Sequence, residues 1–264
     1  MKKALCILVL LTGFGCLKTA TEHRLLAAQR SAGFQLATLS GQTRSQLGQT
    51  GFIAALSGFR ALMADLLWIR AGSAFDRTEW ARMQLLLHTA TQLQPRAVVF
   101  WEMAHFHMAY DASHSMRLNV RQQPSAALRR VAELEYVRIG EDFLKAGLVF
   151  NPESATLWQR LGELYSRRRD DPARAAEAYA EAARKPGALG FLRRMAAYEL
   201  AKVPGKDREA YAQLRSLYLE GEQERLPNLV RLLRQLEEKL AVPEASRVYT
   251  EPSAFRSSGS QAPR

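Results

Sequence analysis

Residues 155–184 read ATLWQRLGELYSRRRDDPARAAEAYAEAAR, and this stretch decides the fold. Trp158, Leu161 and Tyr165 recur at steps of three and four residues, a spacing that places them on one face of a helix. Pro172 then begins a second helical run, because a proline at the first position of a helix lacks only an N–H that has no partner there. The stretch therefore predicts two consecutive helices that are joined by a short polar loop.

The large and small residues of this stretch resemble the pattern of a tetratricopeptide repeat. The resemblance rests on Trp158-x-x-Leu161-Gly162-x-x-Tyr165 in the first helix and on Ala175, Tyr179 and Ala182 in the second. In that family an aromatic residue and a leucine fill the space between helices, while glycine and alanine let two backbones approach closely. The resemblance implies an all-α protein in which tetratricopeptide-like antiparallel helix pairs stack as a short right-handed solenoid.

Helical periodicity continues on both sides of this stretch, and no segment shows the alternation of a strand. Further helices are predicted at residues 52–74, 79–93, 98–111, 126–150, 189–202, 207–223 and 227–240. The chain is also similar to uncharacterised bacterial tetratricopeptide proteins with an N-terminal membrane segment. That similarity rests on the runs 58–61, 64–71, 93–96 and 151–152. The last predicted helix would close the stack as a cap.

The first predicted helix, residues 52–74, carries large apolar residues at three- and four-residue steps. These residues are Phe59, Leu62, Leu66 and Ile69. Arg60, Asp65 and Arg70 interrupt the segment at intervals too short for a membrane span. We therefore expect a helix whose apolar face is buried in a protein core.

The N-terminus has the layout of a secretory signal. Lys2 and Lys3 precede the apolar run 4–15, and no acidic residue occurs before Glu22. At about 12 residues the apolar run is shorter than the roughly 20 that a membrane-spanning helix needs. The sequence therefore favours export of the chain.

Cys16 resembles the lipidated cysteine of bacterial lipoproteins, because the small residue Gly15 precedes it and the leucine-rich run 8–11 lies upstream. A cleaved signal without lipid and an uncleaved anchor are the alternatives. A lipidated cysteine or an anchor would hold the protein, through its N-terminus, at a membrane of the bacterial cell envelope, facing the periplasm or the exterior.

The chain divides into four predicted regions. They are a signal peptide or anchor at 1–21, a partly helical spacer at 22–51, the helical domain at 52–242 and a disordered tail at 243–264. The formal charge of +11 and the pI near 10.0 would suit a polyanionic partner. Nucleic acid is not expected, because an exported chain rarely meets it.

The sequence offers little catalytic chemistry. Nucleophile elbow, phosphate loop, dinucleotide fingerprint and zinc-protease motifs are absent, and a domain that begins beyond Cys16 has no cysteine for a disulfide, a nucleophile or a metal site. His107, Asp111 and His114 would share one face of a continuous helix and could bind zinc, but no fourth ligand is evident. We therefore expect no enzyme activity, cofactor, metal or small-molecule substrate.

The leading interpretation is a scaffold that binds another protein or a peptide on the concave face of the stacked helix pairs. In the family that the chain resembles, this face belongs to the first helix of each pair. Here it carries Asp65, Trp68, Phe106, Tyr110, Gln159, Glu163 and Arg167.

Two alternatives come from other classes of function. The first is binding of an acidic glycan or of lipid head groups. Its candidate residues are Arg129-Arg130, the run 167–169 and Arg193-Arg194. The second is a metal-dependent hydrolase that uses His107, Asp111 and His114.

The lipoprotein hypothesis predicts that the chain, produced in a bacterial host, incorporates radiolabelled palmitate, and that Cys16→Ser abolishes the label. Only a cysteine thiol at this position can take the lipid. A chain that stays membrane-bound without label would instead carry an uncleaved anchor.

Overall fold

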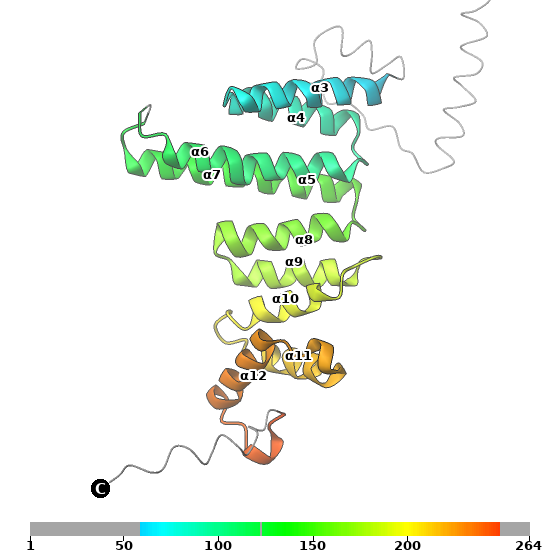
Figure 1. Ribbon diagram of the computed structural model, residues 1–264, viewed down its shortest axis with the longest axis vertical. Helices are drawn as coiled ribbons and strands as arrows, with labels where there is room; N and C mark the ends of the chain where they lie inside the picture. The colour runs from blue at the N-terminus through cyan, green and yellow to red at the C-terminus, as the bar shows by residue number, and fades with distance from the viewer. Residues whose placement is uncertain (1–58, 122, 249–264) are drawn as a thin grey trace, which may run out of the picture. The chain divides into compact units, whose positions relative to one another are not determined.

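The computed structural model describes residues 59–121 and 123–248, which belong to one compact unit of the chain (Figure 1). Within these ranges all regular structure is helical, which confirms the predicted all-α class. The predicted signal or anchor, its candidate lipidation site Cys16 and the spacer 22–51 lie outside the described residues. Residues 249–264 of the predicted tail also lie outside them.

The helices follow one another with short connections (Figure 1). The α-helices are α3 (Arg60–Asp76), α4 (Trp80–Leu93), α5 (Val98–Phe106), α6 (Ser113–Leu118), α7 (Ala126–Phe150), α8 (Ala155–Leu164), α9 (Pro172–Arg184), α10 (Phe191–Leu200), α11 (Asp207–Glu220) and α12 (Pro227–Lys239). Two wide π-helical turns, η1 (His107–Ala112) and η2 (Tyr165–Arg169), extend α5 and α8. Two 3₁₀ turns, η3 (Glu222–Glu224) and η4 (Glu244–Ser246), flank α12. Neighbours in the chain are neighbours in space, as in α3 on α4, α8 on α9 and α9 on α10.

Side-chain caps fix where the middle helices begin. Ser125 and Ser154 accept hydrogen bonds from backbone amides of the first turns of α7 and α8. Asp171 accepts one from the amide of Arg174, and Pro172 occupies the first position of α9. These starts agree with the helix starts that the sequence predicted.

The π-helical turns were not predicted. The helix that begins at Val98 does not end at Asp111 but continues through η1 to Leu118. The hydroxyl of Ser113, the first residue of α6, donates to the carbonyl oxygens of Ala109 and Tyr110 in η1, at 2.6 and 3.1 Å. A wide turn rotates the residues that follow it, so their side chains leave the face that regular α-helical spacing would give them.

The core depends on glycines that face large or backbone groups of a neighbouring helix. A Cβ atom on Gly147 would lie 2.8 Å from the Trp101 ring, and one on Gly162 would lie 2.9 Å from the Tyr179 ring. Both rings are buried, with 0% and 2% exposure. The helices can therefore approach this closely only where the residue has no side chain.

Two loops are joined through one carbonyl oxygen. The Pro95 carbonyl accepts hydrogen bonds from Trp101 Nε1 and from Asn151 Nδ2, both at 2.8 Å. The first bond satisfies the indole of a fully buried ring, and the second ties the loop after α7 to the loop before α5. Together with Gly147, these bonds fix α5 against α7.

The prediction for the face of α3 is wrong. Its large apolar residues were expected in the core, but Phe59, Leu62, Leu66 and Ile69 are 57%, 54%, 45% and 66% exposed. The face that α3 buries instead consists of small residues, Ala64, Ala71 and Ala74. Periodicity identified the residues that share a face but not the face that a neighbour covers.

Gly140 provides a test of the close approach between α7 and η1. A Cβ atom there would lie 2.6 Å from the Ala109 side chain and 3.0 Å from backbone atoms of Ala109 and His105, which cannot move aside. We expect Gly140→Ala to lower the free energy of unfolding by about 1–3 kcal/mol, measured by urea denaturation.

The matched control is Gly72, which also lies inside a helix but would bring its Cβ within 4 Å of nothing. Gly72→Ala should raise stability by roughly 0.5–1 kcal/mol, because alanine favours a helix over glycine. Equal effects of the two substitutions would contradict the close approach.

Candidate functional site

An exposed aromatic pair lies where α5 passes into η1. The Phe106 ring, 46% exposed, stacks on the half-buried Tyr110 ring with centroids 5.3 Å apart and planes at 20°. The Arg168 guanidinium lies over the Tyr110 ring, with its Cζ atom 5.5 Å from the ring centroid. The Tyr110 ring thus contacts both an aromatic ring and a cation, and the Phe106 ring is exposed to solvent.

Charged groups of α8 lie beside this pair. Glu163 accepts hydrogen bonds from Gln159 and Arg160, both at 2.9 Å. Burial raises the Tyr110 pKa, the negative charge of Glu163 raises it further, and the charge of Arg167 opposes this rise. The structure therefore brings together five of the predicted groove residues. They are Phe106, Tyr110, Gln159, Glu163 and Arg167.

An ion pair fixes α8 against α5 at this place. Arg160 contacts Glu102 at 2.6 Å between Nη2 and Oε1, and it also holds Glu163. Arg167 is exposed and makes no ion pair with any residue in the described ranges. The result is a rigid aromatic and carboxylate surface that carries one accessible guanidinium.

The other two predicted groove residues lie elsewhere. Trp68 stacks on Phe100, with centroids 4.9 Å apart, and lines a cavity of about 310 Å³ between α3 and α5 together with Phe75 and His107. Asp65 is exposed on α3 and does not line that cavity. The sequence placed these residues on the correct helices, but the set does not form one continuous site.

The arginine run 167–169 does not form a basic patch. Arg168 donates to Ser113 at 2.7 Å and pairs with the buried Glu133 at 3.3 Å. Arg169 pairs with the buried Glu141 at 2.7 Å. Only the first of the three guanidiniums is left to solvent, because the wide turn η2 directs its neighbours inward.

The Glu141 carboxylate accepts hydrogen bonds from several side chains. Burial would raise the pKa of its carboxyl, but hydrogen bonds from Lys145 and Arg169 outweigh burial and lower the pKa. The Tyr165 hydroxyl donates to the same carboxylate at 3.1 Å. The group is therefore a structural anion that joins α7 to η2.

The other arginines of the predicted basic surface are also engaged. Arg130 contacts Glu133 at 2.9 Å, Arg194 contacts Glu224 at 2.6 Å, and Arg193 pairs with Glu220. Arg129 has backbone partners instead, because its guanidinium donates to the carbonyl oxygens of Gln123 and Pro124 at 2.8 and 2.7 Å.

The histidines do not gather around a possible metal position. His107 Nδ1 lies 2.8 Å from Asp111 Oδ2, but the His114 ring faces the Arg117 guanidinium at 3.0 Å. In the described part of the chain, no three His, Cys, Asp or Glu side chains could hold a metal ion together. His107 and Asp111 lie within the π-helical turn η1, whereas His114 follows it in α6, so regular α-helical spacing does not hold between them.

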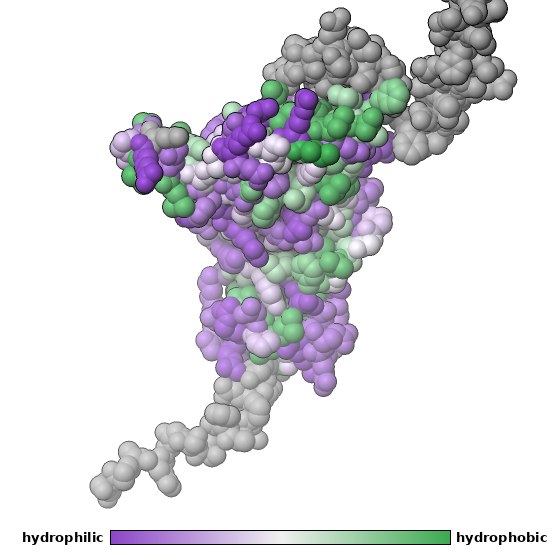
Figure 2. Space-filling model, turned by 45° about the horizontal axis from the view of Figure 1, so that its top comes forward, coloured by the Kyte–Doolittle hydropathy of each residue, from purple (hydrophilic) through white to green (hydrophobic). Residues whose placement is uncertain are grey.

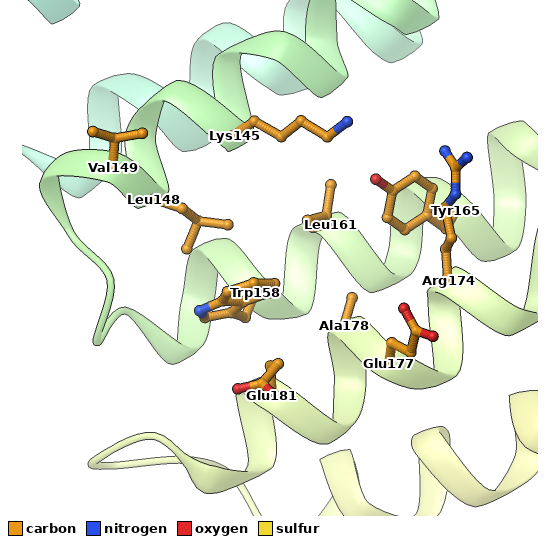
Figure 3. A pocket seen from close by; sticks show the side chains of 10 residues that line it. All are labelled: Lys145, Leu148, Val149, Trp158, Leu161, Tyr165, Arg174, Glu177, Ala178 and Glu181. Atoms are coloured by element: carbon orange, nitrogen blue, oxygen red, sulfur yellow. The ribbon is translucent and has the colours of Figure 1, made fainter.

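A second hollow, of about 650 Å³, lies between α7, α8 and α9 (Figure 3). Apolar side chains form much of its surface, and Lys145, Arg174, Glu177 and Glu181 bring charge to it (Figure 3). The apolar lining residues are Leu148, Val149, Trp158, Leu161, Tyr165 and Ala178.

The sequence did not predict this hollow. Leu161 and Tyr165 were correctly expected to be buried, but Trp158 is only partly covered and Val149 is 75% exposed. The exposure of Trp158 and Val149 depends on where α7 ends relative to α9. The periodicity of the sequence does not indicate that position. A large apolar residue such as Val149 at the end of a helix was the only available signal.

No known protein family matches the chain, and no curated protein is similar to it in sequence. Among the helices of residues 59–121 and 123–248, none is long and apolar enough to cross a membrane.

His105, beneath the aromatic pair, is a buried histidine that favours its neutral form. It is 1% exposed, its ring packs edge-on against Tyr110, and its Nδ1 atom has no hydrogen-bond partner. Burial lowers its pKa from 6.5 to about 4, although a hydrogen bond with the Gly140 backbone opposes that change. Protonation therefore favours the unfolded chain.

From this pKa we predict full stability above pH 6.5, the unfolded value, and a progressive loss as the pH falls towards 4. The loss should reach up to about 3 kcal/mol by the low end of this range. The free energy of unfolding is measured by urea denaturation between pH 7 and 5. This pH range lies above the ordinary pKa values of carboxylates. His105→Gln, which keeps a donor for Gly140, should flatten the pH dependence. An equal slope in both proteins would contradict the assignment to His105.

Proposed function

We propose that the chain is an exported scaffold of tetratricopeptide-like helix pairs, stacked as a short right-handed solenoid, that binds another protein or a peptide at a membrane of the bacterial cell envelope. The observation that carries the proposal is the exposed Phe106–Tyr110 stack beside the accessible guanidinium of Arg167. Aromatic and arginine side chains contribute most to protein–protein binding energy when a partner covers them.

The surface supplies three complementary contacts. Phe106 offers an exposed ring that a partner's apolar side chain can cover, which removes apolar area from water. Arg167 offers a planar donor for a partner's carboxylate, from an acidic side chain or a chain terminus. Glu163 is held in place by Gln159 and Arg160, so it can fix the orientation of a donor on the partner.

Rigidity supports a binding role. The Arg160–Glu102 ion pair and the cation over Tyr110 hold the surface in one arrangement before a partner arrives. A surface that is already ordered loses less conformational entropy on binding. Membrane association, in this proposal, comes from the N-terminal residues 1–21.

The alternatives receive less support. A polyanion site needs clustered free cations, whereas Arg168, Arg169 and Arg194 are occupied by glutamates. A metal-dependent hydrolase needs a converging ligand set, whereas His114 lies against Arg117 instead of beside the His107–Asp111 pair.

Site-specific photo-crosslinking in producing bacteria tests the scaffold. With benzoylphenylalanine in place of Phe106, irradiation should give a distinct adduct, because the ring lies at the proposed contact. Arg167→Glu in the same chain should abolish the adduct by reversing the charge. It should leave the free energy of unfolding within about 0.5 kcal/mol of the parent, since the side chain is exposed.

Two control positions make the result decisive. Leu128, on α7, is 54% exposed and should give no adduct. Val149 borders the hollow between α7, α8 and α9, so an adduct there and none at Phe106 would move the binding site to that hollow. Adducts at neither position would overturn the scaffold proposal.

A further inference from the structure

The helix α3 is apolar on two opposite sides, and the described residues cover only one of them. Its alanines pack against α4, and Trp68 reaches α5. The opposite side carries Phe59, Leu62, Leu66 and Ile69, which we call the α3 stripe; apolar surface gathers over α3 in Figure 2. A contiguous row of large apolar residues on a helix is normally covered by a neighbour.

The helix α8 shows how such a helix is normally packed. Its Leu157 lies against the Gly147 position of α7, and its Gly162 lies against Tyr179 of α9. These two residues are about 140° apart around the helix axis, so α8 has neighbours on two faces. By this comparison the α3 stripe lies where a second helix should pack.

The stripe has the spacing of a parallel coiled-coil seam. Its residues follow one another at steps of three, four and three, as the a and d positions of a heptad do. Asp65 and Arg70 are exposed and flank the seam on opposite sides, at its g and e positions. Neither residue forms an ion pair with another residue of the described part.

The charges beside the α3 stripe indicate both which chain packs against it and in which direction that chain runs. In a parallel pair of identical helices, each g residue meets the e residue five positions later on the other helix. Asp65 would therefore meet Arg70 of a second copy, and two-fold symmetry would form this pair twice. An antiparallel pair would instead place g positions beside g positions and e positions beside e positions, so Asp65 of one copy could not meet Arg70 of the other.

We propose that a second copy of this chain packs in parallel along the α3 stripe, about a two-fold axis, with reciprocal Asp65–Arg70 ion pairs. The interface goes beyond the proposed scaffold function and uses none of the partner-binding surface. The same patch on both copies makes it isologous and closed, so it produces a dimer and no filament.

The size of the stripe sets the strength of the dimer. Four large side chains form an exposed patch of a few hundred Å², which marks an interaction site but is well below the roughly 800 Å² per partner of a standard interface. The dimer should therefore be weak in dilute solution. Parallel packing places both α3 N-termini at the same end, so two chains held in one membrane would gain effective concentration.

Disulfide trapping of the full chain in its membrane tests the arrangement, with the parent chain, which keeps Cys6 and Cys16, as the blank for links through the native thiols. In a parallel pair, Leu62→Cys, Leu66→Cys and Ile69→Cys each meet their own copy and should form linked dimers. An antiparallel pair would link at one of these positions at most. Val131→Cys, 64% exposed on α7, is the control. If Leu66→Cys forms no more linked dimer than Val131→Cys, the proposal is wrong.

A charge exchange tests the ion pairs separately. Asp65→Arg or Arg70→Asp alone should lower the yield of the Leu66→Cys dimer at least about tenfold, and the two together should restore most of it. Failure of the double exchange to restore the yield would overturn the reciprocal pairing. If Leu66→Cys fails to trap but a fluorophore at that position is shielded by phosphatidylglycerol vesicles, the stripe is a lipid-binding face and the dimer is wrong.

Discussion

The close approach of helix backbones at glycine is the constraint on which the rest of the structure depends. Gly147 admits the Trp101 ring between α5 and α7, and Gly162 admits the Tyr179 ring between α8 and α9. Because both rings are buried, neither can move to accept a Cβ atom. The spacing of these helices is thereby fixed, and the positions of Phe106 and the α8 charges follow from it. The exposed surface is thus a consequence of contacts in the core.

Buried glutamates form the second level of organisation. Glu133 and Glu141 receive Arg168 and Arg169 from η2, and the buried Glu199 receives Ser166 and Lys202. A buried carboxylate without such donors would be strongly unfavourable, so the pairs of Arg168 and Arg169 favour the register in which η2 meets α7. The same pairing occupies Arg168 and Arg169, so within the described ranges only Arg167 of the run 167–169 has no carboxylate partner.

The sequence was most informative where periodicity and covalent geometry decide the outcome. The helix starts at capping residues, the burial of Leu161 and Tyr165 and the close approach at Gly162 could all be predicted. The wide turns could not, because a π-helical turn changes side-chain direction without a reliable sequence signal. That change separates His114 from His107 and turns Arg168 inward. The α3 stripe was misassigned for a different reason, since a periodic pattern does not reveal which partner covers it.

The misassigned stripe and the partner-binding surface are connected through the core. Trp68, on the buried side of α3, stacks on Phe100 of α5, and α5 leads directly to Phe106. A second copy on the α3 stripe would therefore rigidly orient two identical aromatic surfaces without covering either of them. A partner with two binding segments would then meet its second site at high effective concentration, and each contact could stay weak. A small exposed surface such as Phe106 with Arg167 is suited to this kind of binding, because pairing compensates for the limited area of each contact.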